Sequence, residues 1–186
     1  MKVTQIKKFP FADEKSKLYY IVKVETDSGI YGLGEVGIPH WGGAIGKAIE
    51  HLSQVVVGQD PFSTEKMWQQ MFRGGFFPAD KVYSCAISGI DIALWDIKSK
   101  ALEMPLYKLL GGPVRDKVVC YPHTQGDTLT ELLDNCKRHV DDGWKFVRWH
   151  QPETGPSQVY VNNLNTLEPV ESIRIGEEQI AAVREA

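Results

Sequence analysis

Apolar residues recur at helical spacing in the stretch from residue 83 to residue 101. Ile87, Ile90, Leu94 and Ile97 follow one another at intervals of three and four residues, which is the period of one face of an α-helix. Such a helix gains most of its stability by packing its apolar face against other elements. We therefore expect this helix to lie at the centre of a hydrophobic core.

Strand-type patterns precede this helix in the chain. Residues 3–9, 18–25 and 30–36 are rich in β-branched and aromatic residues, which favour strands. The Thr-Asp-Ser-Gly sequence at 26–29 is typical of a tight turn, and residues 11–17 form a polar connection. Together these segments predict a three-stranded antiparallel meander.

The third expected strand contains a Gly-x-Gly sequence, Gly32 and Gly34. A dinucleotide-binding loop would need a third glycine in register and a helix directly after it, and this sequence lacks both. Glycine inside a strand more often marks the close approach of another backbone. We expect these two glycines to serve packing.

Two further helices are expected at residues 44–57 and 60–71, between the meander and the central helix. Pro105 should stop the central helix, because proline cannot continue the pattern of main-chain hydrogen bonds. A short turn at 106–110, ended by the glycine pair 111–112, should follow.

The pattern changes after residue 115. Residues 117–123 and 145–150 read as strands on either side of a helix at 129–142, and a unit of this kind forms a right-handed parallel crossover. The sequence therefore predicts an α+β domain at residues 1–115, with the meander and helices, and the beginning of a parallel α/β domain at 116–186.

Composition narrows the class of protein. The 186 residues are 42% hydrophobic and 24% charged, as in ordinary globular proteins. A net charge of −3 gives no electrostatic reason to expect nucleic acid, and no apolar run approaches the roughly 20 residues that span a membrane. The three cysteines lack Cys-x-x-Cys spacing, and the N-terminus lacks the apolar core of a signal peptide. We expect a cytoplasmic protein with reduced thiols.

Candidate functional side chains lie at the end of the strand 145–150. Alternation places Val147 and Trp149 on one face and Arg148 and His150 on the other. If the first pair packs on helices, the second pair is free to face a substrate. Two structural alternatives remain open: Arg148 could pair with an acidic neighbour, and His150 could lie in a hydrated loop.

Other polar and aromatic residues allow two interpretations each. In the loop 37–43, His40 and Trp41 could contact a substrate, or they could cap the following helix and cover the core. Asp91 and Asp96 could suggest a metal site. Five residues is not a one-face spacing on a helix, so we interpret both as structural carboxylates.

The run AISGIDIALWDIKSKALEMPLYKLLGG, at residues 86–112, resembles the segment that closes the N-terminal domain in the mandelate racemase and muconate lactonizing branch of the enolase superfamily. The resemblance implies that residues 1–115 form the capping domain of this superfamily and that residues 116–186 begin a modified TIM barrel. It also implies that the loops 11–17 and 37–43 close over the active site, with His40 and Trp41 lining the part that contacts the substrate.

Many relatives carry a Lys-x-Lys sequence at the end of the second barrel strand, where the second lysine removes the proton next to a substrate carboxylate. Here the corresponding residues are Arg148, Trp149 and His150. This difference argues against the two-lysine racemase and cycloisomerase mechanisms. Arginine is nearly always protonated and suits the stabilisation of an anion, whereas histidine can act as acid or base near neutral pH.

A narrower resemblance is to the mannonate dehydratase group of the same superfamily. That group has an arginine on this strand, a tyrosine in the following loop as the base, and a histidine after the first barrel strand. Arg148, Tyr160 and His123 occupy comparable positions, while His150 replaces the usual glutamine. Without the resemblance, Tyr160 would be read as a surface aromatic residue and His123 as a structural histidine.

The resemblance implies a divalent metal, usually Mg²⁺, held by three carboxylates at the ends of the third, fourth and fifth barrel strands. None of these strands lies within residues 1–186, so we expect the ligands beyond residue 186 and expect this stretch alone to be inactive. The predicted function of the complete enzyme is a metal-dependent dehydratase of sugar acids, which removes the proton α to a carboxylate and eliminates the β-hydroxyl. The predicted assembly is a homo-oligomer.

Two alternatives accompany this prediction. A racemase, epimerase or cycloisomerase could use the same scaffold. In a different class, residues 1–115 could form a non-catalytic binding or assembly domain.

Overall fold

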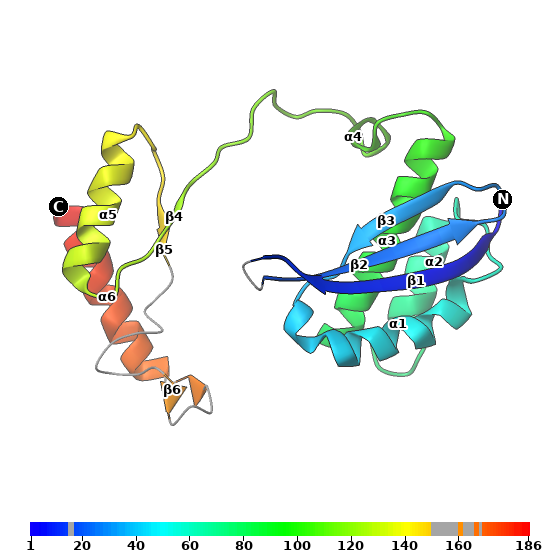
Figure 1. Cartoon of the computed structure of the whole chain (residues 1–186), viewed down its shortest axis with the longest axis horizontal. Helices are drawn as coiled ribbons and strands as arrows, with labels where there is room; N and C mark the ends of the chain where they lie inside the picture. Colours follow the sequence, from blue (N-terminus) through cyan, green and yellow to red (C-terminus); the bar gives the residue numbers. More distant parts are fainter. Residues whose placement is uncertain (15–16, 150–159, 162–165, 168) are drawn as a thin grey trace. The chain divides into compact units, whose positions relative to one another are not determined.

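The computed structural model describes most of the chain (Figure 1), and the described residues are 1–14, 17–149, 160–161, 166–167 and 169–186. These residues form two compact units, Met1–Val114 and Arg115–Ala186. Each unit is described separately below. Among the described residues, no helix combines the length and apolar character that a membrane-spanning segment requires.

The first unit contains the antiparallel meander that the sequence predicts. Strands β1 (Val3–Ala12), β2 (Leu18–Thr26) and β3 (Tyr31–Glu35) lie in the order β1-β2-β3. The register pairs Phe9 with Ile21, and Ile21 with Glu35. The observed strands match the predicted ones to within a few residues, so the capping-domain fold class is confirmed for this unit.

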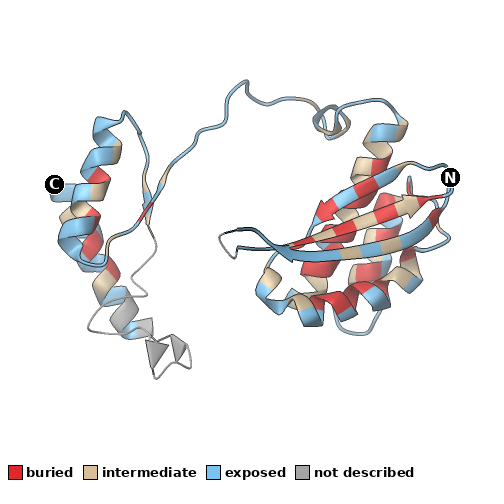
Figure 2. Ribbon diagram, viewed as in Figure 1, coloured by how far each residue is buried: buried red, intermediate tan, exposed pale blue. Residues whose placement is uncertain are grey.

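Three helices cover one face of the sheet (Figure 1): α1 (Gly42–Val56), α2 (Thr64–Arg73) and α3 (Lys81–Ala101). The buried residues concentrate where the sheet and helices meet (Figure 2). The predicted apolar stripe of α3 is buried, with every one of its four isoleucine and leucine residues no more than 2% exposed. The central helix is therefore the main core element of this unit.

The two glycines of β3 allow the strand to lie directly against the backbone of α3. A Cβ atom added to Gly34 would lie 2.0 Å from the carbonyl oxygen of Gly89, and one added to Gly32 would lie 1.9 Å from that of Ala93. Neither position could hold a side chain without moving the helix. The Gly-x-Gly sequence therefore serves packing, as predicted.

Local signals define the ends of α3. Asp80 precedes the helix, and its Oδ1 accepts a hydrogen bond from the backbone N–H of Tyr83 at 2.9 Å, which satisfies a free N-terminal donor. The helix ends at Ala101, and Pro105 precedes the single turn α4 (Leu106–Leu109). Gly112 after α4 has a φ of 88°, a conformation that glycine adopts without strain.

The second unit contains two short parallel strands and two long helices. Strands β4 (His123–Thr124) and β5 (Arg148–Trp149) pair in parallel, and helix α5 (Leu129–Asp141) connects them in sequence. Helix α6 (Pro169–Glu185) follows. A small antiparallel pair, β6 (Tyr160–Val161) with β7 (Thr166–Leu167), precedes α6.

The parallel crossover has the predicted order, but the predicted strand lengths were wrong. Among the described residues, pairing covers two residues on each strand instead of the expected segments 117–123 and 145–150, of which residue 150 lies outside the described part. Apolar side chains flanking the paired residues are exposed, including Val118 at 80% and Phe146 at 55%. The apolar pattern predicted strands along both segments, but a strand also requires a hydrogen-bonding partner along its length.

Candidate active site

The two parallel strands place His123 and Arg148 opposite each other on neighbouring strands. His123 pairs with Arg148 and Thr124 pairs with Trp149 in the ladder. The backbone N–H of Arg148 donates to the carbonyl oxygen of Pro122 at 3.1 Å, which fixes the register. Two residues separated by 25 positions in sequence are thereby neighbours, and both side chains are exposed.

The side chains of β5 alternate between two faces, as predicted. The indole N–H of Trp149 donates to Oε1 of Gln179 on α6 at 3.1 Å, and Gln179 is only 9% exposed. Trp149 therefore anchors one face of the strand to a helix. Arg148, the preceding residue, has a different partner, because its guanidinium contacts Tyr121.

Tyr121 connects the two candidate residues. Nη1 of Arg148 donates to the hydroxyl oxygen of Tyr121 at 3.2 Å, and the guanidinium carbon lies 5.9 Å from the centre of the tyrosine ring. On the same ring, His123 stacks with a centroid distance of 5.9 Å and an interplanar angle of 15°. Cation, phenol and imidazole thus form one contiguous group.

The sequence interpretation did not single out Tyr121. A signal was present, because Tyr121 and His123 are two residues apart in an extended segment and such residues share a face. The structural alternative for Arg148, pairing with an acidic side chain, finds no support in the described part of the chain, where its partner is a phenol.

Two predicted residues cannot be placed in this group. His150 lies outside the described residues, and Tyr160 opens β6, but its side chain is also outside the described part. Their proximity to Arg148 stays a prediction.

The two expected loops occupy the same end of the first unit. Residues 11 and 12 of the expected loop belong to β1, so the connection to β2 is residues 13–17, where the N–H of Asp13 donates to the carbonyl of Lys17 at 3.0 Å. Residues 37–43 contain a short 3₁₀ turn, Pro39–Trp41, and lead into α1. Tyr20, near the start of β2, lies within 3.4 Å of the position a Gly42 side chain would take.

His40 and Trp41 are both exposed, Trp41 at 51%. Trp41 precedes α1 but makes no capping hydrogen bond through its side chain. Trp41 occupies the N-cap position of α1, but capping through a side-chain hydrogen bond finds no support in the described contacts. Contact with a substrate stays a prediction for both.

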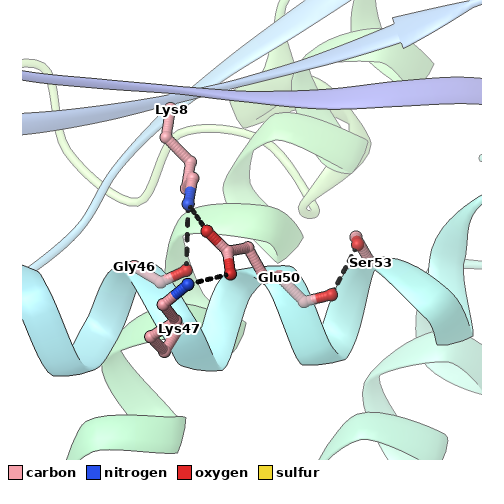
Figure 3. A network of polar contacts seen from close by, with 5 residues as sticks. All are labelled: Lys8, Gly46, Lys47, Glu50 and Ser53. Carbon is pink, nitrogen blue, oxygen red and sulfur yellow. Dashed lines mark hydrogen bonds and ion pairs between the residues drawn. The ribbon is translucent and has the colours of Figure 1, made fainter.

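A polar network attaches α1 to β1 (Figure 3). Nζ of Lys8, on β1, donates to the carbonyl of Gly46 at 3.2 Å and pairs with the carboxylate of Glu50, which also binds Lys47 at 2.9 Å. The bonds from Lys8 and Lys47 lower the pKa of Glu50 to about 2. This network holds the helix that follows the loop 37–43.

The two aspartates of α3, Asp91 and Asp96, lie in different environments. Oδ2 of Asp96 accepts hydrogen bonds from the N–H of Leu33 at 2.9 Å and from Nζ of Lys100 at 2.7 Å. Burial raises the pKa of Asp91, and the charge of Glu65 adds to this effect. Within the described residues, no group of three or more His, Cys, Asp or Glu side chains could hold a metal ion.

A hollow of about 490 Å³ lies between α1, α2 and the segment before α3. Its polar lining includes Asp80, which caps α3, and His51, whose ring meets that of Tyr83 edge-on at 6.2 Å. These groups already have structural contacts, so the hollow offers little polar chemistry to a ligand.

Comparison with known proteins identifies the first unit. Residues 7–111 match the N-terminal domain of the mandelate racemase / muconate lactonizing enzyme family. The chain belongs to this family. The meander, the three covering helices and α4 all fall largely within the match, and the family is part of the enolase superfamily, as the resemblance of residues 86–112 implied.

Relatives of this family member extend across both units. A D-galactonate dehydratase family member from Oceanicola granulosus is 36% identical over 183 residues, which cover 91% of this chain and 44% of the relative. A D-galactonate dehydratase from Verminephrobacter eiseniae is 38% identical over 148 residues, covering 80% of this chain and 38% of the relative. The chain thus spans less than half the length of these curated relatives.

A solved structure has the same fold. An enolase from Pantoea ananatis, with bound D-gluconate and Mg, is 34% identical and superposes with a TM-score of 0.72. The match covers 80% of this chain and 36% of that protein.

Proposed function

We propose that the complete protein containing this chain is a metal-dependent sugar acid dehydratase. In the proposed reaction a base removes the proton α to the substrate carboxylate, and the β-hydroxyl then leaves as water. The observation that carries the proposal is the placement of Arg148 beside His123 at paired strand positions, in a chain whose relatives include proteins named D-galactonate dehydratase.

Arg148 suits an electrostatic role in this reaction. A guanidinium stays charged at neutral pH and cannot act as a base while protonated. Its side chain is exposed and its partner in the described structure is neutral, so its charge is available to an anion. We assign it to stabilising the negative charge that develops when the α-proton leaves, and to lowering the pKa of a neighbouring base.

The proton-transfer roles are assigned to histidine and tyrosine. His150 is proposed as an acid or base, because imidazole titrates near neutral pH. Tyr160 is the second candidate for the base. His123, exposed beside Arg148, is proposed to contact the substrate hydroxyls, and His40 and Trp41 to contribute to specificity.

Mg²⁺ is the proposed cofactor, in line with the metal named for the Pantoea ananatis structure. The described residues do not fit a metal site: Asp96 of α3 is engaged in structural contacts, and no group of three or more ligating side chains is found among these residues. On this proposal the carboxylate ligands belong to barrel strands after residue 186. A homo-oligomer in the cytoplasm is proposed as the working form.

The test is turnover by the complete protein with Mg²⁺. D-galactonate, D-gluconate and D-mannonate are each incubated with the enzyme, and the 2-keto-3-deoxy acid is measured with semicarbazide. We expect one or more of these substrates to give this product. The Arg148→Met variant should form no product, and enzyme treated with EDTA to remove the metal should also be inactive. Conversion to an epimer without loss of water would favour the racemase or epimerase alternative, and no turnover of any acid sugar would favour the non-catalytic one.

A further inference from the structure

We propose that Tyr121 is a positioning residue that orients the Arg148 guanidinium and the His123 imidazole together. The proposal rests on the proposed function, because it concerns residues assigned to that reaction. Tyr121 itself is not assigned a proton-transfer step.

The contacts of Tyr121 use different parts of the side chain. Its hydroxyl oxygen accepts from Nη1 of Arg148 at 3.2 Å, while its ring face stacks on the His123 imidazole at 5.9 Å and 15°. The hydroxyl therefore restrains the cation, and the ring restrains the imidazole. One substitution that removes only the hydroxyl can separate these two effects.

The backbone keeps the three residues in register. Tyr121 lies two residues before His123, and His123 pairs directly with Arg148. The N–H of Arg148 also bonds to the carbonyl of Pro122, between the two aromatic residues, at 3.1 Å. Because this main-chain bond fixes the strand position, the side-chain contacts of Tyr121 decide the remaining freedom of the long arginine side chain.

A phenol is chemically suited to hold an arginine that must bind an anion. A carboxylate partner would neutralise the guanidinium and compete with the substrate. A phenolic oxygen accepts one hydrogen bond without adding charge, and a guanidinium has five N–H donors in all. Within the described residues, Arg148 makes no ion pair with an acidic side chain. Tyr121 thus orients the Arg148 guanidinium and leaves the charge and the other N–H donors of that guanidinium available to the substrate.

Two variants of the complete protein separate positioning from simple support of the fold. Tyr121→Phe removes the hydroxyl and keeps the ring, whereas Tyr121→Leu removes both. The control is Tyr107→Phe, the same change at an exposed tyrosine on α4 (51% exposed). With D-galactonate and Mg²⁺, kcat and KM are measured together with the melting temperature of each variant.

We expect Tyr121→Phe to lower kcat about 3- to 10-fold, the effect of one lost hydrogen bond, with an unchanged KM and melting temperature. Tyr121→Leu should lower kcat further and raise KM, since His123 then loses its stacking partner. The control should match wild type. If Tyr121→Phe kept the wild-type kcat, or if both variants lost activity only in proportion to melting temperature, the positioning role would be refuted.

A second readout does not depend on turnover. In protein labelled with ¹⁵N-arginine, restricted rotation of the Arg148 guanidinium should give separate signals for its two Nη atoms. These signals are assigned by their loss in Arg148→Lys. In Tyr121→Phe the guanidinium should rotate freely, and the two signals should merge. Signals that are unchanged in Tyr121→Phe would overturn the proposed contact. If wild type turned over no sugar acid but the signals merged as expected, the proposed function would fail while the positioning of Arg148 by Tyr121 would stand.

Discussion

Replacing Gly34 by alanine should separate β3 from α3 and destabilise the first unit. The new Cβ would lie 2.0 Å from the carbonyl oxygen of Gly89 and 3.1 Å from the amide nitrogen of Ala93. Ordinary contact begins at 3.4 Å, so the strand and helix backbones would have to move apart by about 1.4 Å. Both atoms that obstruct the methyl group belong to the backbone of a buried helix and cannot rotate away.

The cost can be estimated from the packing around this contact. Gly89 also lies against Val22 and Val36, which are 0% and 1% exposed, so a shift of α3 opens gaps at these side chains as well. Overpacking of a core costs typically 1–3 kcal/mol, and we expect Gly34→Ala to lie in the upper part of this range, at about 2–3 kcal/mol. With a urea m-value of about 1–3 kcal/mol/M, the unfolding midpoint should fall by roughly 0.7–3 M.

The assay is urea unfolding of the 186-residue chain, followed by circular dichroism and tryptophan fluorescence. The matched control is Gly43→Ala, because Gly43 lies in the first turn of α1 and an added Cβ would meet nothing within 4 Å. Alanine in a helix is favoured over glycine, so the control should keep or slightly raise the midpoint. Equal midpoints for Gly34→Ala and the control would refute the close approach of β3 and α3.

Three further predictions test separate parts of the molecule. Asp96→Ala should lower the melting temperature, because the N–H of Leu33 loses its hydrogen bond to the carboxylate, a contribution of about 0.5–1.5 kcal/mol; an unchanged melting temperature would mean that this bond is not structural. Since the pKa of Glu50 is lowered to about 2, its contribution to stability is present above its ordinary pKa of 4.5 and lost as the pH falls toward 2. The difference in urea midpoint between wild type and Glu50→Gln should therefore be largest at pH 6 and shrink at pH 3, and a pH-independent difference would contradict it. In the complete protein, His150→Asn should lower kcat and change its pH profile, and unaltered turnover would exclude an acid-base role.

Much of the first unit could be predicted because its signals are local. The period of the apolar residues in α3 defines both the helix and its buried face, and the strands of the meander are close in sequence. Gly89 was not predicted as a core residue, although it is buried against Val22 and Val36. A glycine has no apolar side chain to contribute to the pattern, so its packing role becomes visible only when the opposing strand is in place.

The second unit shows the limit of pattern-based prediction. Helix α5 was predicted to within one residue, because the apolar positions that define it are local features. The lengths of β4 and β5 were overestimated, because the extent of a parallel strand depends on pairing with a distant segment. Alternation around Arg148 was predicted correctly, since it needs only the knowledge that β5 is extended.

The candidate site was predictable in part for the same reason. Arg148 and His123 could be chosen from their positions at strand ends, and Tyr121 shares a face with His123 in the same extended segment, but the contact of Arg148 with Tyr121 depends on the register between β4 and β5. A one-residue shift of that register would place a different side chain opposite His123. The register is not encoded in any local motif, which is why the contact between Tyr121 and Arg148 emerged only from the structure.

The most direct test of the proposed dehydratase is to follow its reaction by ¹H NMR in ²H₂O. The complete protein is incubated with Mg²⁺ and D-galactonate, and the signals of the α-proton and of the new methylene group are recorded over time. The account predicts loss of the α-proton signal together with formation of a 2-keto-3-deoxy acid, and loss of both changes in Arg148→Met. Exchange of the α-proton for deuterium with formation of an epimer and no elimination of water would contradict it.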